Sequence, residues 1–219
     1  NVITYRALRR LDLHDEELEQ KLPEQVSVGL QRLYALQQED GGWGWWSSDA
    51  SQPYLTAYVV FGLNEAQRAG FAVDGTVLKR AVDFLKESLG QPIDIQRGEQ
   101  ANARAYVLYV LAEYYMDHQG VGDLGRTVAL YERRDGKAYL AMALQLMVPG
   151  ERSRLDALMS DLATAAIRSA TGAHWEEASR DRWTMSSDTR STAIVLQALV
   201  RLQPQSTLIP DVVRWLMTA

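Results

Sequence analysis

The feature of the sequence that most constrains the fold is an internal repeat of apolar helical segments. Residues 57–63, AYVVFGL, align with residues 105–111, AYVLYVL, and the pattern returns at residues 138–144 and 193–199. The offsets between successive repeats are 48, 33 and 55 residues, so the period is irregular. Each segment is apolar almost all round and contains small Ala or Gly residues. The repeat therefore predicts helices that are buried on several sides.

The rest of the chain also has a helical pattern, interrupted by stop signals. Pro53 stands at a first helical position, and Asp74 is a predicted N-cap for the helix after it. No segment shows strand alternation between turn signals, so the predicted class is all-α. Residues 1–5 also look like part of a helix. We expect helices near residues 15–22, 23–38, 53–69, 74–90, 99–117, 124–132, 137–147, 154–169, 189–202 and 210–218.

The more amphipathic helices between the repeats are expected to form an outer layer. An inner ring of helices inside an outer ring is an α/α toroid of helical hairpins. We predict such a toroid with nine or ten helices, as a single domain over residues 1–219. An open α-solenoid is the main alternative, although solenoids keep a steadier period.

Composition narrows the classes of function. Hydrophobic residues make up 47% of the chain, and the net charge of −5 argues against a nucleic-acid partner. The absence of cysteine excludes disulfides and thiolate–metal sites within the chain. No apolar run approaches the roughly 20 residues that cross a bilayer. Because the chain also begins without Met, we expect it to be a piece of a longer protein.

A tryptophan-rich loop follows the helix expected at residues 23–38. Its sequence at residues 37–46, QQEDGGWGWW, holds three of the six tryptophans, and a Q-x-x-G-x-W spacing runs from Gln38 to Trp43. The glycines let the chain turn back after a helix. A tryptophan there can close the gap between two hairpins, with its indole N–H bonded to a carbonyl or an amide. That structural role is the preferred interpretation, and exposed sugar- or peptide-binding tryptophans are the alternative.

A second loop, at residues 172–188, has a similar pattern. Either Ser187 or Asp188 is a predicted N-cap for the next helix. Glu176 and Glu177 are adjacent in the sequence, so they do not face each other across a substrate as paired glycosidase carboxylates do. The candidate binding residues of the two loops are Trp43, Trp45, Trp46, His174 and Trp175.

Known catalytic and metal-binding motifs are absent from the sequence. His14, His118 and His174 have no metal-ligand spacing, and a position near a helix C-terminus is a sufficient explanation for His118. There is no G-x-S-x-G, no P-loop, no H-E-x-x-H and no paired-aspartate motif. We therefore predict no catalytic residue, no metal and no cofactor in this chain.

The two loops and the helices that follow them resemble the thioester-containing domain of the α2-macroglobulin and complement family, its bacterial branch in particular. One end of the likeness lies in QQEDGGWGWW at residues 37–46 and PYLTAYVV at residues 53–60. The other end of the likeness lies in three stretches: HWEE at residues 174–177, STA at 191–193 and IPDVVRWL at 209–216. The resemblance covers roughly residues 24–219. The Gly-Gly-Trp turn alone is less specific, since isoprenoid cyclases and prenyltransferases share it.

This resemblance implies an α/α toroid within a larger multidomain protein, an endopeptidase inhibitor that traps proteases, and not an enzyme. A six-hairpin toroid has twelve helices, so the nine or ten expected here imply an incomplete toroid. In that family a Cys–Gln thioester in a C-x-E-Q motif is exposed when a protease cuts a bait region, and the thioester then acylates the target. This chain has no cysteine, and Leu18-Glu19-Gln20 is not the motif. The thioester therefore lies upstream of this chain or is absent from the protein.

Further expectations follow from the resemblance and from the incomplete ring. The implied partners are proteases, through the parent protein, and other domains of the same chain, in a periplasmic, cell-surface or extracellular location. The faces of Tyr5, Leu8 and Leu11 would lack a partner in an incomplete ring, which predicts some self-association of the fragment. Two alternatives stay open: an isoprenoid cyclase, prenyltransferase-like or glycan-active enzyme on the same toroid, and a plain helical scaffold for protein contacts.

Overall fold

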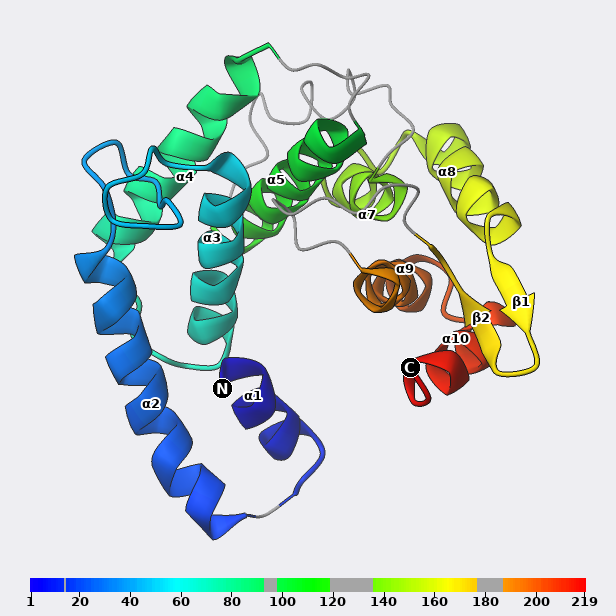
Figure 1. Ribbon diagram of the computed structural model, residues 1–219, viewed down its shortest axis with the longest axis horizontal. Coiled ribbons are helices and arrows are strands. Elements are labelled where there is room, and N and C mark those ends of the chain that lie inside the picture. Colours follow the sequence, from blue (N-terminus) through cyan, green and yellow to red (C-terminus); the bar gives the residue numbers. More distant parts are fainter. Residues whose placement is uncertain (14, 93–97, 119–135, 177–186) are drawn as a thin grey trace. The chain divides into compact units, whose positions relative to one another are not determined.

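The computed structural model describes residues 1–219 except 14, 93–97, 119–135 and 177–186, and it is helical almost throughout (Figure 1). Nine helices and one short hairpin lie in the part of the chain that is described. The residues cluster into two compact units, 1–92 and 93–219. The helix expected at residues 124–132 lies outside the described residues.

The first unit contains helices α1 (Val2–Arg10), α2 (Glu16–Ala35), α3 (Pro53–Arg68) and α4 (Gly75–Gly90). Helix α3 packs against the other three. The expected start signals are confirmed. Pro53 is the first residue of α3, and the Asp74 carboxylate accepts hydrogen bonds from the main-chain N–H groups of Thr76 and Val77, at 2.8 and 3.3 Å.

Helix α2 is continuous, which corrects the expectation of separate helices at residues 15–22 and 23–38. Pro23 lies inside it and cannot donate to the carbonyl four residues earlier. Leu22, Val26 and Leu30 recur on one face of the helix and are all buried. Burial of this apolar stripe holds the helix together across the proline, so tertiary packing outweighs the local penalty.

The proline in α2 gives a first prediction. Pro23→Ala restores the missing N–H donor and removes the steric clash, so it should raise the free energy of unfolding by about 1–3 kcal/mol. Urea unfolding followed by circular dichroism measures the change. Glu24→Ala, at the exposed neighbouring position, is the matched control and should change stability by about 0.5 kcal/mol or less. A loss of stability in Pro23→Ala would contradict this account of α2.

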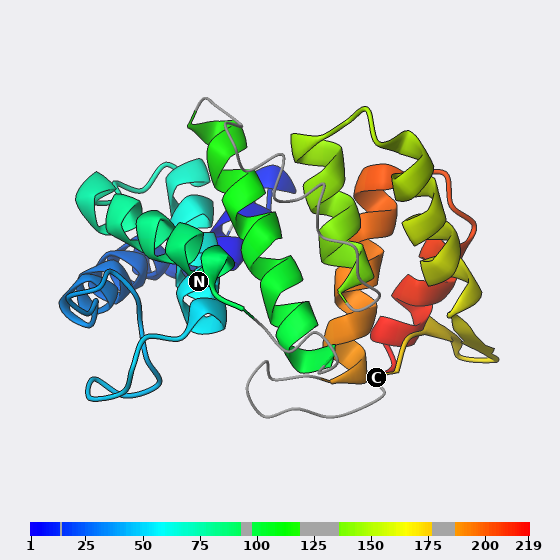
Figure 2. The same ribbon diagram turned by 90° about the horizontal axis from the view of Figure 1, so that it is seen from above.

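The second unit contains helices α5 (Gly98–Asp117), α7 (Lys137–Met147), α8 (Arg152–Thr164), α9 (Asp188–Leu202) and α10 (Leu208–Leu216). Helix α7 contacts α5, α8 and α9, and Figure 2 shows it between α5 and α9. Its side chains are buried almost all round, as its repeat sequence predicts. The Ser187 hydroxyl accepts from the main-chain N–H of Arg190 at 3.1 Å, which identifies Ser187 as the N-cap of α9.

A short antiparallel hairpin of strands β1 (Ile167–Ser169) and β2 (Gly172–His174) follows α8. No strand was predicted, and the helix expected at residues 154–169 ends at Thr164. Gly172 has φ +132°, and a Cβ at this position would lie 2.2 Å from the carbonyl oxygen of Asp211. The hairpin therefore depends on close packing against α10, a contact distant in sequence that local patterns do not report.

The internal repeat corresponds to the buried helices α3, α5, α7 and α9. The first, fourth and seventh residues of the repeat segments in α3, α5 and α7 are all buried. In α9 the equivalent Ala193 is exposed, while Thr192, Val195 and Leu199 are buried. Burial on several sides is thus confirmed for three segments, and α9 buries a narrower face.

The repeat also aligns two buried glutamates. Glu65 of α3 and Glu113 of α5 each lie eight residues after the first alanine of their segment, and both are buried. Glu65 forms ion pairs with Arg6 and with Arg68. Glu113 forms an ion pair with Arg201, the equivalent position of α9. A buried carboxylate needs such a partner. The Arg6 pair links α1 to α3 and the Arg201 pair links α9 to α5, whereas the Arg68 pair lies within α3.

Tyr109 lies beside the Glu113–Arg201 pair in the second unit. Its hydroxyl accepts a hydrogen bond from Gln197 Nε2 at 3.0 Å, and the guanidinium carbon of Arg201 lies 5.8 Å from the ring centroid. Burial raises the pKa of Tyr109 well above its ordinary value, and the Glu113 carboxylate raises it further, whereas Arg201 lowers it.

This raised pKa predicts how stability changes in alkali. In the unfolded chain Tyr109 loses its proton near pH 10, before it does in the folded protein. The unfolded state then holds fewer protons, so the stabilisation present below about pH 10 is lost as the pH rises further. Tyr109→Phe should flatten this decline by up to about 1.4 kcal/mol per pH unit, measured by urea unfolding between about pH 9 and pH 11.

A control variant separates ionisation from hydrogen bonding at Tyr109. Gln197→Leu removes the amide that donates to the hydroxyl but keeps the ionisable phenol, so it should lower stability at every pH and retain the wild-type slope. An unchanged slope in Tyr109→Phe would show that the ionisation of Tyr109 is not linked to unfolding.

Candidate tryptophan corners

Trp43 closes the corner between α2 and α3. Its side chain is only 3% exposed, and its indole Nε1–H donates to the carbonyl oxygen of Leu33 near the end of α2, at 2.9 Å. Its main-chain N–H donates to the hydroxyl of Thr56 in the first turn of α3, at 3.0 Å. One tryptophan therefore ties the end of one helix to the start of the next, and its buried main-chain N–H finds its acceptor in the Thr56 hydroxyl.

Trp175 makes the same set of bonds in the second unit. Its indole Nε1–H donates to the Leu162 carbonyl oxygen in α8 at 2.8 Å, and its main-chain N–H donates to the Thr192 hydroxyl in α9 at 3.1 Å. The predicted structural role, with the indole N–H bonded to a carbonyl, is confirmed for both tryptophans. Sequence reasoning missed the two threonines. The signal was present, since Thr56 and Thr192 each precede the first alanine of a repeat segment.

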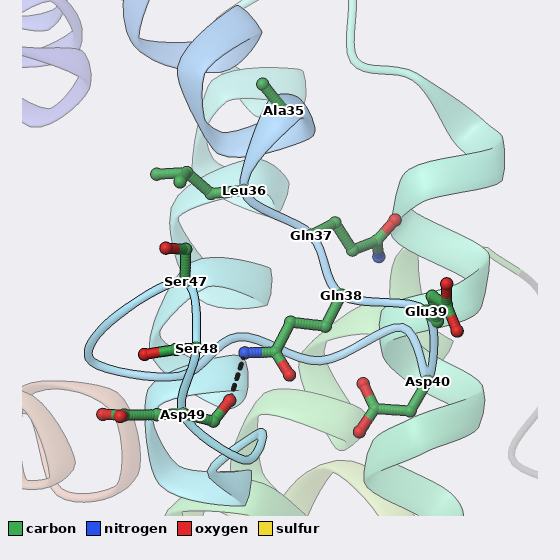
Figure 3. A pocket seen from close by; sticks show the side chains of 9 residues that line it. All are labelled: Ala35, Leu36, Gln37, Gln38, Glu39, Asp40, Ser47, Ser48 and Asp49. Carbon is green, nitrogen blue, oxygen red and sulfur yellow. Dashed lines mark hydrogen bonds between the residues drawn. The ribbon is translucent and has the colours of Figure 1, made fainter.

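The loop around Trp43 is fixed by its own side chains. Gly41 has φ +90°, and a Cβ there would lie 2.5 Å from the carbonyl oxygen of Arg80, so this position of the turn requires glycine. Gln37 Nε2 donates to the carbonyl oxygens of Gly41 and Val77, both at 2.9 Å. Gln38 Nε2 donates to the carbonyl oxygen of Asp49 at 2.6 Å and joins the two sides of the loop (Figure 3).

An open pocket of about 510 Å³ lies between these two sides of the loop (Figure 3). Its charged lining groups are all carboxylates. Asp40 Oδ1 accepts from the main-chain N–H of Gly42 at 2.9 Å and from the Ser51 hydroxyl at 2.7 Å. The pocket is lined by Ala35, Leu36, Gln37, Gln38, Glu39, Asp40, Ser47, Ser48 and Asp49.

The five candidate binding residues differ in burial and in their contacts. Trp43 and Trp175 are buried and brace the corners, whereas the side chains of Trp45 and Trp46 are 40% and 74% exposed. His174 stacks on Trp215 of α10, with ring centroids 4.6 Å apart, and its Nε2 lies 3.3 Å from Glu176 Oε1. The three tryptophans of the first loop belong to the first unit, and His174 and Trp175 belong to the second.

Among the other titratable candidates, the structure describes His118. His118 stacks on Tyr114, and its Nδ1 lies 2.9 Å from the Tyr114 carbonyl oxygen at the end of α5. His14 and Glu177 lie outside the described residues. In the part of the chain with described coordinates, no group of three or more histidines, aspartates and glutamates could hold a metal ion. None of the described helices is both long enough and apolar enough to cross a membrane.

Comparisons with known proteins identify relatives of this arrangement. The family model of the A-macroglobulin TED domain matches residues 1–92, the first compact unit. The chain is 25% identical over 207 residues to an α2-macroglobulin of Thermotoga maritima, and the match covers 85% of this chain and 12% of that protein.

Two solved structures share the fold. Salmonella α2-macroglobulin reacted with methylamine matches with a TM-score of 0.70 and 21% identity, over 96% of this chain and 14% of that one. Escherichia coli α2-macroglobulin from domain MG7 to the C-terminus matches with a TM-score of 0.65 and 20% identity, over 96% of this chain and 32% of that one. These likenesses confirm the predicted α/α toroid class. The chain spans only a third or less of the length of these proteins.

The corner bonds predict the effect of removing one hydroxyl. Thr56→Val keeps the shape of the side chain but leaves the buried main-chain N–H of Trp43 without an acceptor, so it should lower the free energy of unfolding by about 1–3 kcal/mol. Thr192→Val should have a similar effect through Trp175. Urea unfolding measures both.

Thr76→Val is the matched control for these variants, because Thr76 is exposed in the first turn of α4. It should change stability by about 0.5 kcal/mol or less. Equal effects of all three substitutions would contradict the bracing role of the corner threonines.

Proposed function

We propose, from the premise that the chain belongs to the α2-macroglobulin family as part of its thioester-containing (TED) domain, that its parent protein is an endopeptidase inhibitor that traps proteases. The observation that carries the proposal is the match of the TED family model to the unit that contains the Trp43 corner. In this proposal the chain acts as a scaffold and binding module of the inhibitor and performs no catalysis itself.

Covalent capture is the proposed chemistry of the parent protein. The chain has no cysteine, so a thioester would come from a Cys–Gln pair outside it. An amine of the bound protease would attack the thioester carbonyl, form an amide bond and release the cysteine as a free thiol. By resemblance, the histidine with which some complement proteins catalyse the transfer falls in the loop before an inner helix, and the matching residues 47–52 contain none. We therefore propose lysine amines as the acceptors.

The parent protein tests this proposal. Methylamine is a small amine nucleophile, and Salmonella α2-macroglobulin is one protein that has been reacted with it. Treating the parent protein with methylamine should release one thiol per molecule, measured with a chromogenic disulfide reagent. The variant in which the candidate cysteine is replaced by serine is the control and should release none. A parent protein that yields no new thiol would overturn the thioester part.

Protease trapping has its own measurement. A trapped protease keeps activity on small substrates but loses it on large protein substrates, because the inhibitor encloses it without blocking its active site. We expect trypsin mixed with the parent protein to show this difference. Loss of activity on small substrates as well would indicate a different mode of inhibition. We also propose a periplasmic or extracellular location for the parent protein, where it would meet foreign proteases.

A further inference from the structure

Three large apolar side chains stand in solvent around the loop of residues 36–52. Trp46 is 74% exposed and Leu36 is 53% exposed, and Trp45 is also exposed. The neighbouring Trp43 is buried and fully engaged in the corner between α2 and α3. The structural role of this loop therefore uses one tryptophan of three and leaves the other two unexplained. Exposed tryptophans grouped on one fixed loop are typical of contact surfaces.

One of the three exposed apolar residues lines the open pocket, and the two tryptophans directly precede its lining residue Ser47 in the sequence. Leu36 lines the pocket, and so does Ser47, the residue after Trp46. In Figure 3 the Leu36 and Ser47 side chains both point toward the left of the view. The main-chain N–H of Asp49 donates to the Trp46 carbonyl oxygen at 3.0 Å, so Trp46 and Asp49 are the two ends of one tight turn. This turn keeps the backbones of Trp46 and Asp49 close together.

All charged side chains of this loop are negative. Residues 36–52 contain Glu39, Asp40 and Asp49 and no Lys, Arg or His. Within the described part of the chain, the carboxylates of Glu39 and Asp49 form no ion pair and accept no hydrogen bond. Arg80 lies nearby, but its guanidinium donates to the main-chain oxygens of Gln38 and Glu39, at 2.8 and 3.0 Å.

The hydrogen-bonding groups left at the pocket favour one kind of ligand. Neutral sugars are usually held by groups that both donate and accept, such as side-chain amides. Here the Gln37 amide nitrogen donates within the corner, and the Gln38 amide both donates to Asp49 and accepts from Ser51 Oγ at 3.1 Å. Ser47 and Ser48 keep hydroxyls that can donate or accept, whereas the charged groups that remain are carboxylates, which accept only. An ammonium or guanidinium group donates only, and it is also attracted to the face of an indole ring.

We propose that this loop docks a lysine- or arginine-rich peptide segment of a partner protein. The cationic side chains lie against the indole of Trp46 and beside the carboxylates of Glu39 and Asp49, and their aliphatic stems contact Leu36. Each element has a separate energetic role: the rings and Leu36 take up the apolar stems, and the carboxylates balance the charge. The inference is independent of the proposed thioester chemistry, because it concerns only residues of this chain.

Titration calorimetry of the 219-residue chain tests the proposal with three probes at low ionic strength. The probes are an acetylated hexalysine amide, the corresponding hexaglutamate peptide and maltohexaose. Hexalysine should bind, and the other two should not. Binding should weaken as salt is added, because exposed charges are screened beyond about 10 Å at 0.1 M salt.

Matched variants separate the loop from the general negative charge of the chain. Trp46→Ala should weaken hexalysine binding about two- to fivefold, the effect of losing an exposed cation–π contact. The double variant Glu39→Gln with Asp49→Asn should weaken it by a similar or larger factor. Glu87→Gln removes one exposed negative charge from α4 outside the loop and should leave the affinity unchanged. Circular dichroism and thermal melting check that each variant is folded.

Several results would overturn the proposal. One is an absence of hexalysine binding at millimolar concentration. Another is equal binding by the wild type, Trp46→Ala and the double charge variant. Binding of maltohexaose that depends on Trp46 would identify a sugar site instead. Self-association that depends on Trp46, seen by sedimentation velocity, would identify a second copy of the chain as the occupant. None of these measurements involves a thiol. A result that overturns the docking proposal would therefore leave the thioester proposal unaffected.

Discussion

The hydrogen bond from a buried tryptophan N–H to the last turn of a helix is the interaction on which each corner depends. A helix end leaves carbonyl oxygens without partners, and a buried end needs a donor from elsewhere in the chain. Trp43 donates to the Leu33 carbonyl oxygen, which also accepts from the main-chain N–H of Leu36 at 3.2 Å, and Trp175 donates to the Leu162 carbonyl oxygen. In both corners the main-chain N–H of the same tryptophan is bonded to a buried threonine of the next helix. One residue thereby fixes both the end of a helix and the start of its successor.

The same corner explains how the exposed tryptophans are held. Side chains that bind a partner are effective when the backbone beneath them is fixed before binding, because less conformational entropy is then lost. In this loop the Gln37 and Gln38 amides, Gly41 and the turn that ends at Asp49 set the backbone. Trp45 and Trp46 therefore stand on a fixed loop although their own side chains are in solvent. The bracing by Trp43 and the proposed docking by Trp46 are two roles of one segment.

Much of the fold could be predicted from the sequence because its signals are local. Apolar repeats with small residues predicted the buried helices, and Pro53 and Asp74 predicted helix starts. The errors also have physical causes. Pro23 indicated a helix boundary by local propensity, but the buried stripe of Leu22, Val26 and Leu30 keeps α2 continuous. The short hairpin depends on the close approach of Gly172 to α10, which has no signal within the hairpin itself.

The sequence by itself determined the helical class, the repeat, the two tryptophan loops and the likeness to the thioester-containing domain. It could not separate Trp43 from Trp45 and Trp46, since all three share one glycine-rich stretch. Only the tertiary structure decided that Trp43 is buried and bonded to Leu33 and Thr56 while Trp46 is exposed. The physical reason is that burial depends on neighbours from other helices, whereas helix formation and turning depend mainly on residues close in the chain.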